Sequence, residues 1–172
     1  MTDCNQTIVD TLRSASMDYF DLDLETVVYK FTETSIKDYC DYVSRYLTLS
    51  DITKLHEMYF TTSSENVLIG IFDTIVVKSY YSKSEFDNAL SVYSNSTLAS
   101  CEHVEQMISK NTKLKTIISE KLYLVTDSST QFSHDIVRIA EHIEQSLNIF
   151  HNIGLEHGDC RLDNVGYRIA MD

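Results

Sequence analysis

The chain has 172 residues, 43% of them hydrophobic, which is enough apolar material for one domain with a core or for two small lobes. Its net charge of −12 argues against nucleic-acid or anionic-membrane partners, because both are polyanions that require clustered Lys and Arg. The sequence shows no apolar run of membrane-spanning length and no secretory signal, so we expect an intracellular, cytoplasmic protein.

The four cysteines are widely separated, and no pair has the spacing of a zinc site. They are Cys4, Cys40, Cys101 and Cys160. In an intracellular protein this pattern predicts reduced thiols rather than disulfides.

The first 50 residues carry apolar side chains at spacings of three and four, which predicts helices over residues 8–17 and 34–47. Thr34 or Ser35 is placed to cap the second of these helices. We interpret this region as a helical scaffold or adaptor segment.

From residue 55 the sequence becomes rich in β-branched and aromatic residues. It predicts three consecutive antiparallel strands over 55–62, 66–72 and 74–81, separated by short polar stretches. Helical spacing returns over 86–95.

Residues 115–119 and 122–126 predict two more strands around the tight Glu120–Lys121 connection. A long buried helix follows, with Ser133 as its cap and Gly154 as its left-handed end. Its apolar stripe comprises Ile136, Ile139, Ala140, Ile143, Leu147 and Phe150.

Three of the four glycines surround the octet HGDCRLDN, residues 157–164. They are Gly154, Gly158 and Gly166. A backbone that bends sharply beside two aspartates, an arginine and an asparagine is either a polar surface turn or a functional site.

The spacing of His157, Asp159 and Asn164 resembles the catalytic loop of the protein-kinase-like superfamily, in which His-x-Asp is followed five residues later by Asn. The flanking sequence IEQSLNIFHNIGLEHGD also resembles the helix and turn that precede this loop. The alternative for His157 alone is a hydrogen-bonded turn histidine.

The resemblance implies a role for each residue. Asp159 would orient the attacking hydroxyl and accept its proton, and Arg161 would neutralise the transferred phosphoryl group. Asn164 would hold Mg²⁺ on the phosphates of ATP, and Asp172 would be the second metal ligand. His157 would complete the catalytic loop.

The segment TIVVKSYY resembles the strand that carries the lysine for the ATP phosphates, which nominates Lys78; the alternative is an ordinary strand lysine. The implied fold is α+β and kinase-like, with an antiparallel five-stranded small lobe and the first helices and catalytic loop of a truncated large lobe. The expected divisions are an N-terminal helical extension at 1–54, the small lobe at 55–126 and the start of the large lobe at 127–172.

The sequence departs from the family pattern at several positions. The glycine-rich loop is nearly absent, with only Gly70 near it, and Ala89 stands where the glutamate partner of the strand lysine is expected. Gly158 replaces the Arg that couples many kinases to a phosphorylated loop, as in small-molecule and divergent, including viral, kinases. The chain ends at Asp172, before an activation segment, which suggests a fragment or a short kinase mimic.

We therefore expect an ATP- and Mg²⁺-dependent phosphotransferase that acts on a Ser, Thr or Tyr hydroxyl of a protein. One alternative is a catalytically inert mimic, or pseudokinase, that binds or inhibits a true kinase. Another is a small-molecule kinase of the aminoglycoside or choline type. The expected partners are a nucleotide and a protein substrate or partner kinase, in a host cell if the protein is viral.

Overall fold

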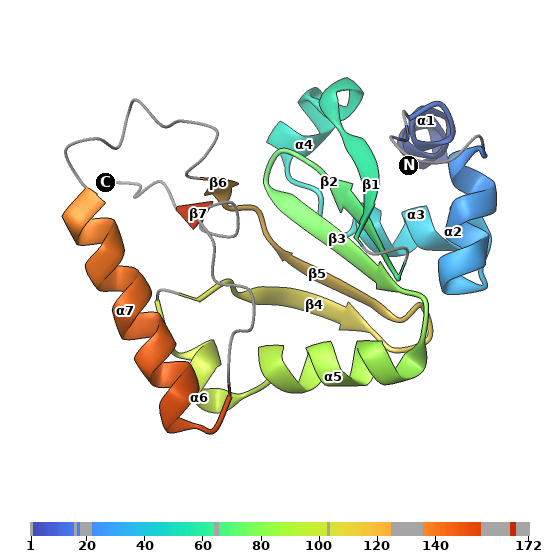
Figure 1. Cartoon of the computed structure of the whole chain (residues 1–172). Helices are drawn as coiled ribbons and strands as arrows, with labels where there is room; N and C mark the ends of the chain where they lie inside the picture. The colour runs from blue at the N-terminus through green and yellow to red at the C-terminus, as the bar shows by residue number, and fades with distance from the viewer. Residues whose placement is uncertain are drawn as a thin grey trace. The chain divides into compact units, whose positions relative to one another are not determined.

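A computed structural model gives the fold of the chain (Figure 1). It describes residues 2–15, 17, 22–63, 66–102, 104–124, 136–155 and 166–167. The chain forms two compact units. The first comprises residues 1–92 and 107–121, and the second comprises residues 93–106 and 122–172.

Three helices begin the first unit: α1 (Thr2–Arg13), α2 (Leu24–Thr32) and α3 (Ile36–Ser44). The helix predicted over 8–17 thus begins earlier and ends at Arg13, and α3 lies inside the range predicted over 34–47. Ser35 caps α3, as one of the two predicted candidates, because its hydroxyl accepts a hydrogen bond from the Asp38 N–H at 3.2 Å.

A five-stranded antiparallel sheet forms the centre of the first unit (Figure 1). Its strands are β1 (Tyr59–Ser63), β2 (Val67–Ile71), β3 (Ile75–Tyr80), β4 (Met107–Asn111) and β5 (Thr116–Glu120), in the spatial order β1-β2-β3-β5-β4. The three consecutive strands predicted between residues 55 and 81 are present, but the first begins only at Tyr59, because Leu55–Glu57 forms a 3-10 helix. The class is α+β.

The predicted pairing of 115–119 with 122–126 is wrong. β5 pairs with β3 and β4, and the fifth strand of the sheet is Met107–Asn111, which the sequence did not indicate. The short strand β6 (Tyr123–Leu124) pairs instead with β7 (Gly166–Tyr167) in the second unit. The reason is that Lys121 donates its N–H to the carbonyl of Thr74 at 3.0 Å, which continues the β3 side of the sheet rather than a hairpin.

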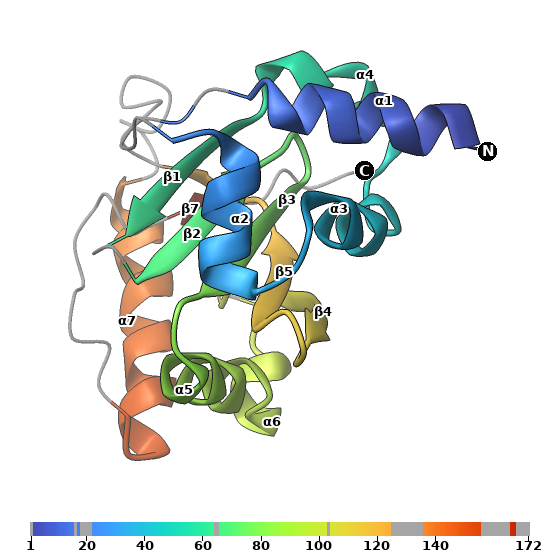
Figure 2. The same cartoon turned by 90° about the vertical axis from the view of Figure 1, so that its right-hand side faces the viewer.

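The main core lies between one face of the sheet and α1–α3, and Figure 2 shows α2 in front of β1, β2 and β3. Strands β1, β2, β3 and β5 contribute residues of one face to this core, as the two-residue period of a strand requires. The fully buried members with the largest side chains include Leu12, Phe31, Tyr39, Phe60, Leu68 and Ile118. The N-terminal helices therefore share one hydrophobic core with the sheet.

The opposite face of the sheet carries the helix α5 (Lys83–Tyr93) at one end. Phe86 of α5 is fully buried, and its ring meets that of Tyr80 edge-on with the centroids 6.2 Å apart. Helical spacing predicted for 86–95 is thus confirmed, with a start three residues earlier.

The outer edge of β4 has two features that discourage pairing with a further strand. The register shifts between Met107 and Ser109, as in a β-bulge, and Lys110 is exposed. Tyr42 of α3 donates its hydroxyl to the Ser109 hydroxyl at 2.8 Å, which fixes this edge to the helical layer.

The second unit contains the helices α6 (Ser96–Ala99) and α7 (Ile136–Asn152), which pack against each other. The predicted apolar stripe of α7 is confirmed in part: Ile139, Ile143, Leu147 and Phe150 are half-buried, whereas Ala140 is exposed. No side chain described in α7 is fully buried, in contrast to the buried helix that we expected. The predicted cap Ser133 lies outside the described residues.

Among the residues that the structure describes, no helix has both the length and the apolar character needed to cross a membrane.

Candidate functional site

Lys78 lies in the interior of β3, on the face of the sheet opposite the main core. Strand alternation buries Ile75, Val77 and Ser79 on the core side and places Lys78 with Val76 on the other side. Lys78 is half-buried. The predicted phosphate-binding lysine therefore rises from the middle of a sheet rather than from a loop.

The neighbours of Lys78 across the sheet are aliphatic. Lys78 is paired in register with Ile69 of β2 on one side and with Ile117 of β5 on the other. An aliphatic surround of this kind buries the stem of a lysine side chain.

In α5, the positions one turn after the buried Phe86 are occupied by Ala89 and Leu90, neither of which carries a carboxylate. Ala89 and Leu90, one turn beyond Phe86, are both half-buried. Glu85 lies in the first turn, where its N–H is bound by the Ser82 hydroxyl at 3.2 Å. Ala89 therefore remains a departure from the charge pair that kinases place next to the strand lysine.

The connection between β1 and β2 runs from Ser63 to Val67 and has no glycine in its sequence. Gly70, which is near this loop in the sequence, lies instead inside β2, opposite Phe60 in the register. Gly70 is therefore a packing residue, and the close backbone approach of a glycine-rich phosphate loop is not provided by it.

The remaining predicted site residues, His157, Asp159, Arg161, Asn164 and Asp172, lie outside the described residues. The structure does describe the chain on both sides of the octet, at the end of α7 and at β7.

The end of α7 is fixed by a glycine in the predicted left-handed conformation. Gly154 has a φ of +81°, its N–H donates to the carbonyl of His151 at 3.0 Å, and the Leu155 N–H donates to the carbonyl of Phe150 at 2.8 Å. These are the two hydrogen bonds of a Schellman motif, which ends a helix in a defined direction. On the other side of the octet, Tyr167 of β7 is paired with Tyr123 of β6.

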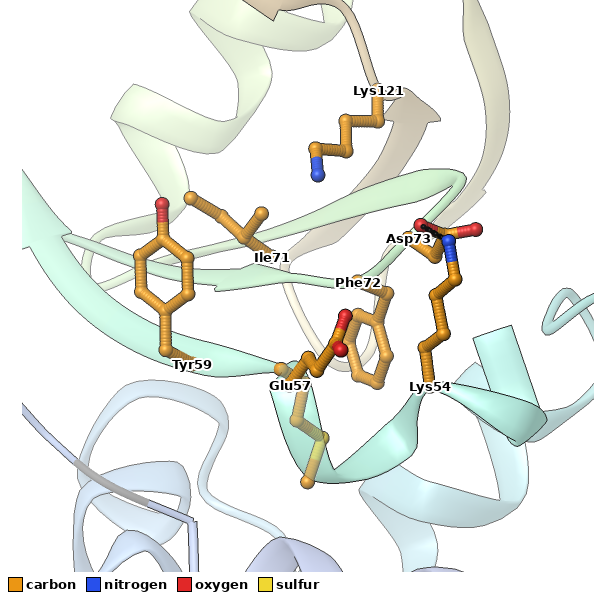
Figure 3. A pocket seen from close by; sticks show the side chains of 8 residues that line it. Lys54, Glu57, Tyr59, Ile71, Phe72, Asp73 and Lys121 are labelled. Carbon is orange, nitrogen blue, oxygen red and sulfur yellow. Dashed lines mark hydrogen bonds and ion pairs between the residues drawn. The ribbon is translucent and has the colours of Figure 1, made fainter. Parts of the chain in front are cut away.

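A pocket of about 70 Å³ in the first unit was not predicted from the sequence (Figure 3). It is lined by Lys54, Glu57, Met58, Tyr59, Ile71, Phe72, Asp73 and Lys121. These residues come from four separate segments and form no motif, so no sequence signal indicates them. The volume suits water or a small ion rather than a nucleotide, whose sites measure hundreds of Å³.

The charged groups of this pocket are partly paired. Lys54 Nζ lies 3.3 Å from Asp73 Oδ1, and the Ser50 hydroxyl also donates to Asp73. The hydrogen bond from Ser50, together with Lys54 and Lys121, holds the pKa of Asp73 below its ordinary value, although partial burial opposes this shift.

Within the described part of the chain, no group of three or more His, Cys, Asp or Glu side chains is arranged to hold a metal ion. Both proposed metal ligands, Asn164 and Asp172, are outside it. Burial raises the pKa of the Cys40 thiol to about 12, which keeps this thiol protonated and unreactive near neutral pH.

Comparison with protein-family models, with curated proteins and with solved structures gave no match. The function of this chain is therefore argued from its own residues.

Proposed function

We propose that this chain is an ATP-dependent phosphotransferase of the protein-kinase type, which transfers a phosphoryl group to a hydroxyl of a protein. The proposal rests chiefly on the spacing of His157, Asp159 and Asn164 in the octet. The position of Lys78 in the interior of β3 supports it, because the lysine that kinases use for the ATP phosphates also lies on a strand.

The residues would divide the work between binding and chemistry. Lys78 and Arg161 would bind phosphate oxygens, and Asp159 would orient the acceptor hydroxyl and take its proton. Asn164 and Asp172 are oxygen donors of the kind that Mg²⁺ prefers, and the ion would neutralise charge on the phosphates when bound.

Nucleotide binding is tested by thermal unfolding with and without millimolar Mg-ATP, because a ligand of the folded state raises its stability. We expect the wild type to be stabilised and Lys78→Met to lose most of this effect. Lys110→Met is the matched control, since Lys110 lies on the same face one strand beyond Ile117 and is exposed. Absence of any shift in the wild type would contradict nucleotide binding.

Phosphoryl transfer is tested with labelled ATP and generic protein acceptors. Asp159→Asn should keep the nucleotide-induced stabilisation and lose transfer, because the substitution removes the base and leaves Lys78 in place. A variant that transfers as fast as the wild type would exclude Asp159 as the catalytic base.

A catalytically inert mimic is the second candidate, and two observations favour it. Ala89 stands where kinases place the glutamate partner of the strand lysine, and the β1–β2 connection has no glycine. A mimic would bind its partner kinase equally well after Asp159→Asn. A third candidate, phosphorylation of a small alcohol such as an aminoglycoside or choline, is supported by Gly158 and is tested by replacing the protein acceptor.

A further inference from the structure

The short helix α4 (Leu49–Thr53) is attached to the sheet by polar contacts. Its one buried residue is Asp51, which is 1% exposed, whereas Leu49 is 81% exposed and Ile52 is 40% exposed. A five-residue helix has no stability of its own, and this one gains little from apolar packing. Its position therefore depends on directional hydrogen bonds.

The buried carboxylate of Asp51 connects α4 to the turn between β2 and β3. Its Oδ2 accepts hydrogen bonds from the N–H and the hydroxyl of Thr48, at 2.8 and 2.9 Å, which form the cap of α4. The same carboxylate accepts from the N–H of Thr74 at 2.7 Å and from its hydroxyl at 2.5 Å. Two donors of the turn are thus satisfied by one buried charge, a strong type of hydrogen bond.

The turn between β2 and β3 also supplies a carboxylate, that of Asp73, to the α4 segment. Asp73 accepts hydrogen bonds from the Ser50 hydroxyl and from Lys54 Nζ, both of the α4 segment. Each of the two segments therefore supplies one acidic acceptor to the other, and Figure 3 shows Lys54 pointing to Asp73. Because the contacts share the same two segments, we expect the loss of one hydrogen bond to weaken the others.

The same turn also binds Lys121, the residue at which the chain leaves the sheet. The carbonyl of Thr74 accepts from the N–H of Lys121 at 3.0 Å, directly after β5. Lys121 is the last residue of the first unit, and the chain continues from it into the second. Thr74 thus uses its N–H and hydroxyl for Asp51 and its carbonyl for Lys121.

We propose that α4, the turn residues Asp73 and Thr74, and the Lys121 amide form a latch that opens and closes as one unit, separately from the sheet core. When the latch is closed, it fixes the path of the chain out of β5. Segments held by few apolar contacts belong to the low-stability end of a structure, and the shared acceptors make their opening concerted. The latch is thus a conformational device within the first unit.

The test is residue-resolved amide hydrogen exchange on the full chain. Thr74→Val removes the hydroxyl donor to Asp51 and keeps the shape and the backbone N–H. We expect the protection of the Lys121 amide to fall by about tenfold or more, as for a lost hydrogen bond to a charged group. The amides of Val77 and Ile117, which are buried in the sheet, should exchange as in the wild type.

Thr53→Val is the matched control, because the Thr53 hydroxyl donates to the Leu49 carbonyl inside α4, at 2.8 Å, and to no residue of the β2–β3 turn that the structure describes. It should leave Lys121 protected. Asp73→Ala offers a second opening of the latch if Thr74→Val folds poorly. Unchanged protection of Lys121 in both latch variants would overturn the proposal, as would an equal loss of protection at Ile117, which would mean general destabilisation.

Discussion

The ring of Phe60 lies against the backbone of Gly70 on the neighbouring strand, so closely that a Cβ at residue 70 would be 2.6 Å from Phe60 Cε1. The ring itself is fully buried and meets Phe72 edge-on, with centroids 6.2 Å apart. Phe60 is therefore held from several sides and has little room to move.

Gly70→Ala should destabilise the protein by about 1–3 kcal/mol, the usual cost of adding a methyl group to a filled core. Urea unfolding measures this change. Phe60→Leu in the same chain should recover part of the loss, because the smaller side chain frees the space over residue 70. A Gly70→Ala protein as stable as the wild type would show that the Phe60 ring can move to make room for the added methyl group.

Two tyrosines of α3 provide a matched pair for the energetics of buried hydroxyls. The Tyr39 hydroxyl is buried and has no hydrogen-bond partner among the described residues, and its pKa is raised by burial. Ser79 lies near the Tyr39 hydroxyl, but the Ser79 hydroxyl is hydrogen-bonded to the Thr116 hydroxyl, at 2.8 Å. The Tyr42 hydroxyl, in contrast, donates to Ser109.

We expect Tyr39→Phe to be neutral or stabilising, because it removes a polar group that is buried without a partner. Tyr42→Phe should cost about 0.5–1.5 kcal/mol, since it removes a formed hydrogen bond. Denaturant unfolding of the two variants decides the question, and a larger cost for Tyr39→Phe than for Tyr42→Phe would contradict it.

The lowered pKa of Asp73 has a consequence for stability in acid. A carboxylate whose pKa is lower in the folded state stabilises the protein above the ordinary value of about 3.9, and this contribution disappears as the pH falls through the folded pKa. Asp73→Asn should therefore reduce the loss of unfolding free energy that accompanies acidification from about pH 5 downward.

The control for this measurement is Glu57→Gln, which removes a carboxylate from the same pocket without touching Ser50 or Lys54. Asp73→Asn should flatten the acid dependence more than Glu57→Gln does. Equal slopes for the two variants would argue against a special role of the Asp73 contacts.

The shared core predicts that the sheet does not fold without residues 1–54. Their removal would expose the core side of the sheet, including Phe60, Leu68 and Val77, all fully buried. Each large apolar side chain contributes about 1.5–3 kcal/mol on burial, so exposing these three and losing the helix residues that cover them is comparable to a typical total stability of about 5–15 kcal/mol. We expect the 55–172 chain to aggregate or to bind a hydrophobic dye, and a separate 1–54 peptide to restore its structure in part. A folded, soluble 55–172 chain would show that the helices are dispensable.

Local signals predicted the parts of the fold that depend on neighbouring residues. Runs of β-branched and aromatic residues indicated β1 to β3, Ser35 was one of two candidate caps for α3, and Gly154 indicated the end of α7. Each of these depends on residues within one element or one turn.

The prediction errors arose where residues distant in the sequence determine which strands pair. Met107–Asn111 is short and carries Lys110 and Asn111, so its strand character comes from pairing with β5 rather than from its own composition. The hairpin expected at Glu120–Lys121 fails because the Lys121 N–H binds Thr74, far away in the sequence. The latch depends likewise on pairs such as Asp51 and Thr74, which no local pattern connects.

The Schellman end of α7 has a consequence for substitutions at Gly154. The left-handed φ of +81° and the two hydrogen bonds at this end set the direction in which the chain leaves the helix at Leu155. A Cβ at residue 154 would meet no atom within 4 Å, so Gly154→Ala would act through backbone strain and not through packing.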